Sequence, residues 1–198
     1  RKKVLGVDEL KPYDMYVPLV PDAKIKISYD DAVRRILEGL WPLGKDYLGD
    51  LKTAFESGWV DVYESEGKGS GAYSWSTYAT HPYVLMNYQG KPRDVMTLAH
   101  ELGHGVHQVL AAGQGELLSS TPLTLAETAS VFGEMLTFRK LLDGAKTPAE
   151  KKTLLAGKVE DMINTVVRQI AFYDFECKLH AARAEGELTP EDINALWM

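Results

Sequence analysis

Residues 100–104, His-Glu-Leu-Gly-His, are the stretch from which the fold of this chain can be predicted. Two histidines four residues apart lie on one face of an α-helix, with Cβ atoms about 5–6 Å apart, so both imidazoles can reach one metal ion. Glu101, between them, is placed to act on a water molecule that such an ion activates. The motif therefore predicts a metal-binding helix with His100 and His104 as ligands.

The residues around this motif are sorted as on a helix with one buried face. At about 100° per residue, one arc of the helix is polar and the opposite arc is apolar. The polar arc holds Thr97, His100, Glu101, His104, His107 and Gln108, and the apolar arc holds Val95, Leu98, Leu102, Val106, Val109 and Leu110. This sorting favours a helix whose back lies in a core and whose reactive stripe faces a cleft. The alternative, two ordinary polar histidines, ranks below it because a third ligand can be found.

We expect this metal-binding helix to occupy residues 91–113, because Pro92 suits a first turn and Gly113 suits a helix end. Gly103 and Gly105 each lower helix stability by about 1 kcal/mol relative to alanine. Their predicted use is a close backbone approach to a neighbouring element or to substrate. Ordinary helix packing is the alternative.

A third ligand must come from elsewhere in the chain, because catalytic zinc usually takes three protein ligands and keeps one position for water. The extended metzincin pattern needs glycine and histidine at the positions that here hold His107 and Leu110, so that class is excluded. Cys177 is the only cysteine, which excludes a cysteine-based metal site and an internal disulfide. The remaining option is a carboxylate from a later helix.

Three downstream glutamates are candidates for this carboxylate. Glu116 lies in a glycine-flanked loop too near the end of the metal-binding helix to fold back easily onto His100. Glu127 lies on the next expected helix, which a short loop can place beside the first. Glu134 lies on the same face as Glu127 but about 10 Å further along the axis. We therefore assign Glu127 to the metal.

Two further polar residues are predicted to support the site. Glu134 suits the outer shell, where a carboxylate orients a ligating imidazole, and an ion pair with a nearby Arg or Lys is the alternative. His107 faces the reactive stripe and is predicted to be a supporting or substrate-side residue. His81 and His180 have no comparable neighbours in the sequence, and we expect them to be structural or exposed to solvent.

The rest of the chain is predicted to be mainly helical with one small antiparallel sheet in residues 58–90. Residues 11–27 are expected to form an irregular lead-in that contains Pro12, Pro18 and Pro21. Expected helices cover 28–40, 45–57, 121–143 and 147–186, and expected strands cover 59–63, 72–78 and 83–88. In the helix of 121–143, Thr121 is predicted to be the cap and Pro122 the first helical residue. The glycine-rich stretch 67–71 is not a phosphate loop, because a strand rather than a helix is expected to follow it.

Composition limits the class of protein. The chain has 198 residues, 45% of them hydrophobic and 25% charged, which fits one globular domain. Its formal net charge of −6 argues against nucleic acid or an anionic membrane as a main partner. No apolar run approaches the roughly 18 residues of a spanning helix. We therefore expect a cytoplasmic enzyme. Both ends of the sequence look cut, so we also expect a single partial catalytic domain from a longer protein.

Three segments, in order, resemble a known family. Ser70–Tyr78 with Val84–Tyr88, then Ala99–His107, then Leu125–Glu134 are similar to the M3 family of zinc metallopeptidases, specifically its oligoendopeptidase F branch. The similarity is clearest over residues 67–139. Three segments that match jointly are more specific than the five-residue motif by itself.

The resemblance implies a zincin-like catalytic region in a larger, mainly helical peptidase. It implies one Zn²⁺ per chain on His100, His104 and Glu127, with Glu101 as the general base. It also implies short peptides as substrates and the remaining lobes of the parent enzyme as partners. The family's substrate-binding His and Tyr residues, which stabilise the tetrahedral intermediate, lie in a later segment and cannot be placed on this sequence.

Substrate binding and two other functions remain open at the level of sequence. A peptide backbone can pair with an edge strand around residues 71–74, which makes Gly71, Ala72 and Tyr73 the predicted substrate-binding residues. The alternative is that the aromatic residues there only pack the sheet. Within enzymes, a zinc carboxypeptidase would use the same three ligands. A non-enzymatic helical module, or a fragment that is inactive by itself, is the other alternative.

Overall fold

A computed structural model describes residues 2–11, 13–14, 17, 20 and 24–198. The predicted turn residues Pro12, Pro18 and Pro21 lie outside the described residues. The chain divides into two compact units, one formed by Arg1–Val20 with Lys152–Met198 and the other by Pro21–Lys151. The second unit contains every residue of the predicted site.

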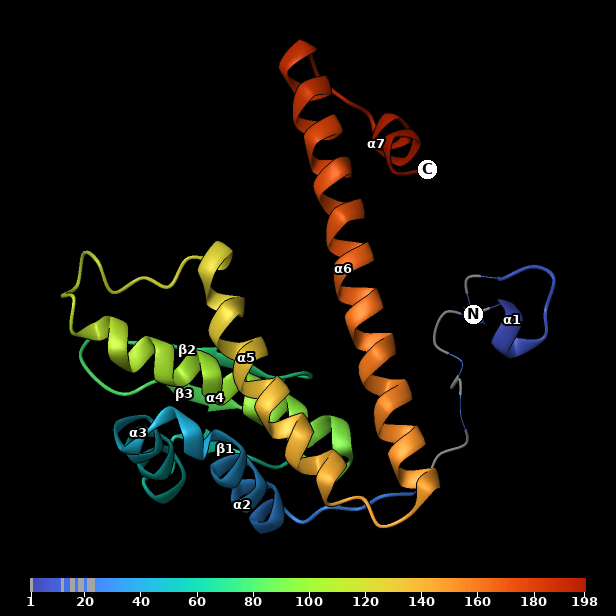
Figure 1. Ribbon diagram of the computed structural model, residues 1–198. Helices are drawn as coiled ribbons and strands as arrows, with labels where there is room; N and C mark the ends of the chain where they lie inside the picture. Colours follow the sequence, from blue (N-terminus) through green and yellow to red (C-terminus); the bar gives the residue numbers. More distant parts are fainter. Residues whose placement is uncertain (1, 12, 15–16, 18–19, 21–23) are drawn as a thin grey trace. The chain divides into compact units, whose positions relative to one another are not determined.

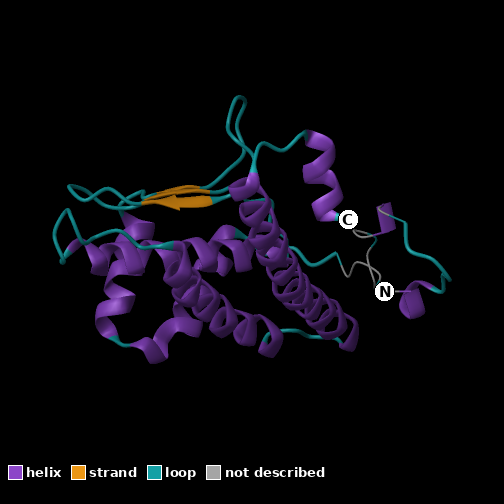
Figure 2. Ribbon diagram, turned by 90° about the horizontal axis from the view of Figure 1, so that it is seen from above, coloured by secondary structure: helices purple, strands orange, loops and turns teal. Residues whose placement is uncertain are grey.

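The second unit is built around helix α4, Pro92–Ala112 (Figure 1). Helix α5, Leu123–Asp143, packs along α4, and both also contact α2, Tyr29–Leu40. Helix α3, Lys45–Glu56, touches α2 and α4, and a 3-10 turn, Trp41–Leu43, links α2 to α3. Three short strands, β1 (Val60–Asp61), β2 (Tyr73–Trp75) and β3 (Tyr83–Leu85), form the sheet. Viewed from above, the sheet and the helices form separate layers (Figure 2).

The sheet is mixed, and the prediction of an antiparallel sheet is wrong for one of its two pairings. Strand β3 lies in the middle and pairs antiparallel with β2, in the register Ser74 to Val84. Strand β1 pairs parallel with β3, with Val60 opposite Val84. The long connection over residues 62–72 lets the chain skip the position next to β1 and leaves that position to β3. Strand β2 is therefore an edge strand.

The predicted apolar face of α4 lies in the core. Val95, Leu98, Leu102 and Val106 are at most 3% exposed. The prediction was wrong for Leu110, which is 63% exposed because it lies in the last turn of α4. The mainly helical class with a small sheet is confirmed.

Gly103 makes the close approach that the sequence predicts, and Gly105 does not. A Cβ atom built on Gly103 would lie 2.7 Å from the Cα atom of Ser130 on α5, which is closer than atoms can approach. A Cβ on Gly105 would meet only the Ser74 hydroxyl, at 3.8 Å. Only Gly103 is therefore needed to let the two helices meet backbone to backbone.

Helix ends follow their sequence signals in most places. Ser28 caps α2 by accepting a hydrogen bond from the Asp31 amide, and Glu150 donates its amide to the Thr147 hydroxyl. Helix α5 departs from prediction, because it begins at Leu123 with Pro122 as its cap, not with Thr121 as cap and Pro122 as the first helical residue. The extended ψ of 148° at Pro122 places that residue just outside the helix.

The first unit contains helices α1 (Lys2–Leu5), α6 beyond its first turn (Pro148–Glu185 as a whole) and α7 (Pro190–Trp197). Within it, Trp197 packs against Phe172 and Phe175 of α6. Thr189 and Asp192 form a reciprocal cap at the start of α7. Among the described residues, no helix has the length and hydropathy needed to cross a membrane.

Candidate metal centre

Helices α4 and α5 bring His100, His104 and Glu127 together. One Glu127 carboxylate oxygen, Oε2, lies 3.2 Å from His100 Nε2 and 3.6 Å from His104 Nε2. One potential ligand atom from each residue lies within 4.8 Å of the other two. The helical repeat of α4 places the two imidazoles on one face, and the packing of α5 places the carboxylate opposite them.

These three residues fit a divalent metal ion. Two ligands that each lie about 2.1 Å from one tetrahedral ion are about 3.4 Å apart, close to the measured separations of the Glu127 oxygen from the two histidines. Two imidazoles and one carboxylate are also a donor set that catalytic zinc sites use. Both the separations and the donor types are therefore those expected for a site that binds a divalent metal ion.

Glu101 lies one helical position from His100 and is largely buried. Only 7% of its surface is exposed, and the backbone of Ser74 on β2 forms a hydrogen bond with it. Burial raises the pKa of Glu101, as does the charge of Glu127, while His100 and the Ser74 hydrogen bond oppose the rise. A carboxylate with a raised pKa, next to a metal site, is suited to accept and return a proton near neutral pH.

The two imidazoles have different surroundings. Burial lowers the pKa of His104, which favours the neutral form that a metal ligand requires. Burial also acts on His100, but the hydrogen bond with Glu134 and the neighbouring carboxylates outweigh it and raise the pKa. The Glu134 oxygen lies 3.3 Å from His100 Nδ1, the nitrogen that faces away from Glu127. The outer contact predicted for Glu134 is therefore present in the geometry.

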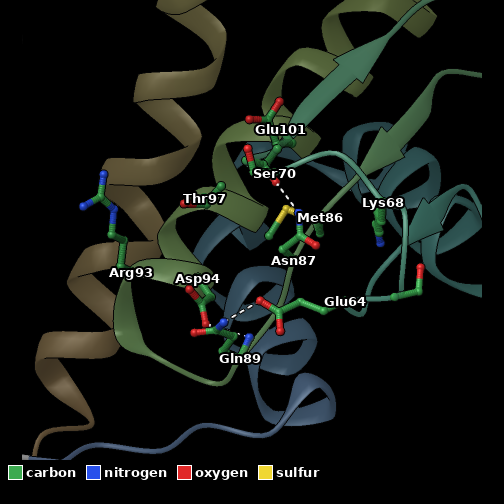
Figure 3. A pocket seen from close by; sticks show the side chains of 13 residues that line it. Glu64, Lys68, Ser70, Met86, Asn87, Gln89, Arg93, Asp94, Thr97 and Glu101 are labelled. Carbon is green, nitrogen blue, oxygen red and sulfur yellow. Dashed lines mark hydrogen bonds between the residues drawn. The ribbon is translucent and has the colours of Figure 1, made fainter.

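A pocket of about 820 Å³ opens beside Glu101 (Figure 3). Glu101 lies at one end of it, and Glu64 and Gln89 lie at the other. Gly71 and Ala72 line the pocket, whereas Tyr73 does not and is 51% exposed. The structure thus brings two of the three predicted substrate-binding residues to the same pocket as the predicted base.

Comparisons with known proteins assign the chain to a family. The model of Peptidase family M3 matches residues 1–198, the whole chain. The chain belongs to peptidase family M3. This membership extends the predicted resemblance, which is clearest over residues 67–139, to both flanks. The family is one of metallopeptidases, and among the described residues His100, His104 and Glu127 form a group that could hold a metal ion.

Curated relatives place the chain in the predicted oligoendopeptidase F branch of family M3. It is 42% identical over 193 residues to oligopeptidase PepF of Bacillus subtilis, covering 96% of this chain and 29% of the relative. It is 41% identical over 199 residues to an oligoendopeptidase F homologue of Lactococcus lactis, covering 100% and 33%. The chain spans about a third of the length of these relatives.

Solved structures share the fold. A crystal structure from Chlamydophila abortus superposes with a TM-score of 0.76 and 36% identity, covering 98% of this chain and 33% of that one. Oligoendopeptidase F of Enterococcus faecium superposes with a TM-score of 0.55 and 24% identity, covering 99% and 28%. The M3 fold of the chain is therefore supported by both sequence and structure.

Other sequence candidates are not part of the three-residue cluster. Glu116 is in the loop between α4 and α5 and is not part of the three-residue group. His107 lines a largely apolar hollow of about 880 Å³ with Glu127 and Phe132, and its Nδ1 is buried without a hydrogen-bond partner among the described residues. His81 stacks on Trp59, with ring centroids 4.7 Å apart, and His180 is exposed on α6, as expected for residues outside the site.

Three residues beside the site were not predicted from sequence. Asn87, two residues after the end of β3, donates two hydrogen bonds, to the carbonyls of Gly69 and Gly71, and so holds the glycine-rich loop at the pocket. Gln108 on α4 donates to the Ser74 carbonyl and accepts from the Ser74 hydroxyl. Ser130 on α5 donates to Glu127. Gln108 belongs to the predicted polar arc, but no spacing rule marks Asn87 or Ser130.

Proposed function

We propose that the protein containing this chain is a zinc-dependent endopeptidase that hydrolyses internal bonds of short peptides. One Zn²⁺ per chain would be held by His100, His104 and Glu127. The observation that carries the proposal is the convergence of these three residues from two helices, with the buried Glu101 beside them. Membership of peptidase family M3 supports the same reaction class.

Glu101 is the proposed general base. A zinc ion, when bound, polarises the scissile carbonyl and makes a water molecule acidic enough to attack near neutral pH. Glu101 accepts the proton of the attacking water and later delivers it to the departing amine. The Ser74 backbone holds the Glu101 carboxylate, and burial raises the pKa of that carboxylate, which favours its taking up the proton.

Glu134 and His107 are proposed as supporting residues. Glu134 orients the imidazole of His100 through Nδ1, which leaves Nε2 aimed at the metal. His107 faces the apolar hollow beside Glu127 and is proposed to contact substrate or to support the site there.

Substrate is proposed to bind along the free edge of β2 and in the pocket beside it. The edge groups of Ser74 are already engaged, since its backbone bonds with Glu101 and its carbonyl accepts from Gln108. Backbone groups along a strand alternate in direction, so Ala72 presents its groups to the same side as Ser74. Ala72 is therefore the proposed site of backbone pairing, with Gly71 and Tyr73 flanking it. Such pairing contacts the backbone of the peptide more than its side chains, so peptides of many sequences can bind.

The proposal also covers the substrates, the partners and the location of the protein. Short peptides are the substrates, and the further partners are the remaining lobes of the longer enzyme, because the relatives are about three times the length of this chain. The cytoplasm is the proposed location. The 198 residues by themselves are proposed to have little activity.

Glu101→Gln in the full-length protein tests the proposal. Zinc content, measured by atomic absorption, is expected to stay at one ion per chain, while peptide hydrolysis falls by about 10²–10⁴-fold because the base is lost. Normal turnover would contradict the assignment of the base. Mass analysis of products from a peptide blocked at both ends separates internal cleavage from carboxypeptidase action.

A further inference from the structure

The hydroxyl group of Ser130 is buried and points at the proposed metal ligand. Ser130 is 0% exposed, and its Oγ lies 2.8 Å from Glu127 Oε2 and 3.2 Å from the Glu127 carbonyl oxygen. Oε2 is also the oxygen that lies near both histidines. A carboxylate oxygen has two lone pairs, so Oε2 can accept from Ser130 and still face the metal position.

The packing of α5 against α4 explains a small residue at position 130 but not a hydroxyl group. The Cα atom of Ser130 lies 2.7 Å from where a Cβ on Gly103 would be, so the helices are in backbone contact there. Alanine would satisfy that contact without the free-energy cost of burying a polar group. The hydroxyl is accounted for by its acceptor on Glu127.

The side chain of Glu127 is held less by surrounding packing than the side chains of the two histidines. Its side chain is 57% exposed, compared with 26% for His100 and 16% for His104. A long, exposed glutamate side chain samples several rotamers, and ordering it for metal binding costs conformational entropy. A hydrogen bond from a buried donor on a closely packed helix reduces the number of rotamers that Glu127 samples before a metal binds.

We propose that Ser130 is a positioning residue that holds the Glu127 carboxylate toward His100 and His104. This inference rests on the proposed metal role of Glu127. Gly103 contributes indirectly, because it allows α5 to come close enough for Ser130 to be fully buried. Ser130 acts on metal affinity through Glu127 and takes no part in the reaction itself.

Ser130→Ala in the full-length protein is the main test. The zinc dissociation constant, measured by competition with a chromophoric chelator, is expected to rise about 10–100-fold, as for other outer-shell partners of metal ligands. At saturating zinc, kcat is expected to stay within a few-fold of normal.

Thr137→Val is the matched control. Thr137 lies two turns further along α5, is also 0% exposed and also meets a glycine, since a Cβ on Gly39 would lie 3.2 Å from its Cα. Its hydroxyl has no hydrogen-bond partner among the described residues. Removing this hydroxyl is expected to leave the zinc dissociation constant unchanged. Equal weakening by Thr137→Val would show a general packing effect and overturn the inference.

A double-mutant comparison separates this inference from the proposed function. In a Glu127→Ala background, Ser130→Ala is expected to cause no further loss of zinc affinity, because the acceptor is already gone. An unchanged affinity in Ser130→Ala, or an equal loss in both backgrounds, would overturn the positioning role alone. An unchanged affinity in Glu127→Ala would instead overturn the metal role of Glu127, and with it the inference.

Discussion

The two sides of Glu101 are built in different ways. On one side, the proposed metal ligands lie on α4 and α5, two helices of 21 residues each whose backbones touch at Gly103 and Ser130. On the other side, the pocket is lined by the connection that contains the glycine-rich loop, by the extended segment after β3 and by the first half of α4. The helical side depends on buried packing, whereas the pocket side depends on a few hydrogen bonds that involve Asn87, Gln108 and Glu101. Substitutions on the two sides should therefore affect different measurements.

The largest expected effect is on the helical side. Glu127→Ala removes one of three proposed ligands, so zinc affinity should fall by more than the roughly 10–100-fold that follows loss of an outer-shell partner. Metal content after dialysis measures the loss. A variant that keeps stoichiometric zinc would indicate that Glu116 or Glu134, and not Glu127, is the third ligand.

Gly103→Ala should also damage the helical side, and Gly105→Ala provides its control on the same helix. Alanine at 103 forces α4 and α5 apart, at a cost of about 1–3 kcal/mol in the free energy of unfolding, and displaces Ser130 and Glu127. Alanine at 105 has room and should stabilise α4 by up to about 1 kcal/mol. Chemical unfolding and zinc titration of both variants test the pair. Similar behaviour of the two would mean that the helices tolerate separation.

Asn87→Ala should disturb only the pocket side. It removes two hydrogen bonds to the glycine-rich loop, each with a net value of about 0.5–1.5 kcal/mol. We expect KM for a peptide substrate to rise roughly 3–10-fold, as a loosened loop binds less well, with zinc affinity unchanged. A loss of zinc in this variant would show that the two sides are coupled.

The smallest expected effect is on the stability of the folded state at alkaline pH. Tyr29 packs edge-on against Phe55, Tyr63 and Tyr88, and burial raises its pKa from 10.0 to about 12. The folded state therefore holds this proton more tightly than the unfolded chain does. The contribution to stability is complete below pH 10 and is lost as the pH rises toward 12. Tyr29→Phe should make the unfolding midpoint less dependent on pH between 10 and 12, and an unchanged slope would contradict this assignment.

Local patterns in the sequence were enough to predict which residues form the helical side. The spacing of His100 and His104 needs only the 3.6-residue repeat, and the apolar arc of α4 correctly identified Val95, Leu98, Leu102 and Val106 as core. The length of the loop after α4 was enough to select Glu127 as the partner. The roles of these residues stay predictions that the geometry supports.

The sequence did not predict which strands pair or which residues that are distant along the chain form hydrogen bonds. The alternation of residues 59–63 suggests a strand but does not say which neighbour it pairs with, so the parallel β1–β3 pairing was missed. Asn87 was missed because its two acceptors are backbone carbonyls, which carry no sequence signal. The same holds for the Ser74 backbone at Glu101.

The sequence by itself determined the helical content and the positions of His100, Glu101 and His104 on one face, because these follow from short-range periodicity and motif spacing. The family was indicated by the resemblance of three segments to family M3. Only the tertiary structure decided the order of the strands, the pocket beside Glu101 and the burial of Ser130 against Gly103. These depend on contacts between residues that are distant along the chain. The free energy of such contacts is set by packing in three dimensions, which no local pattern specifies.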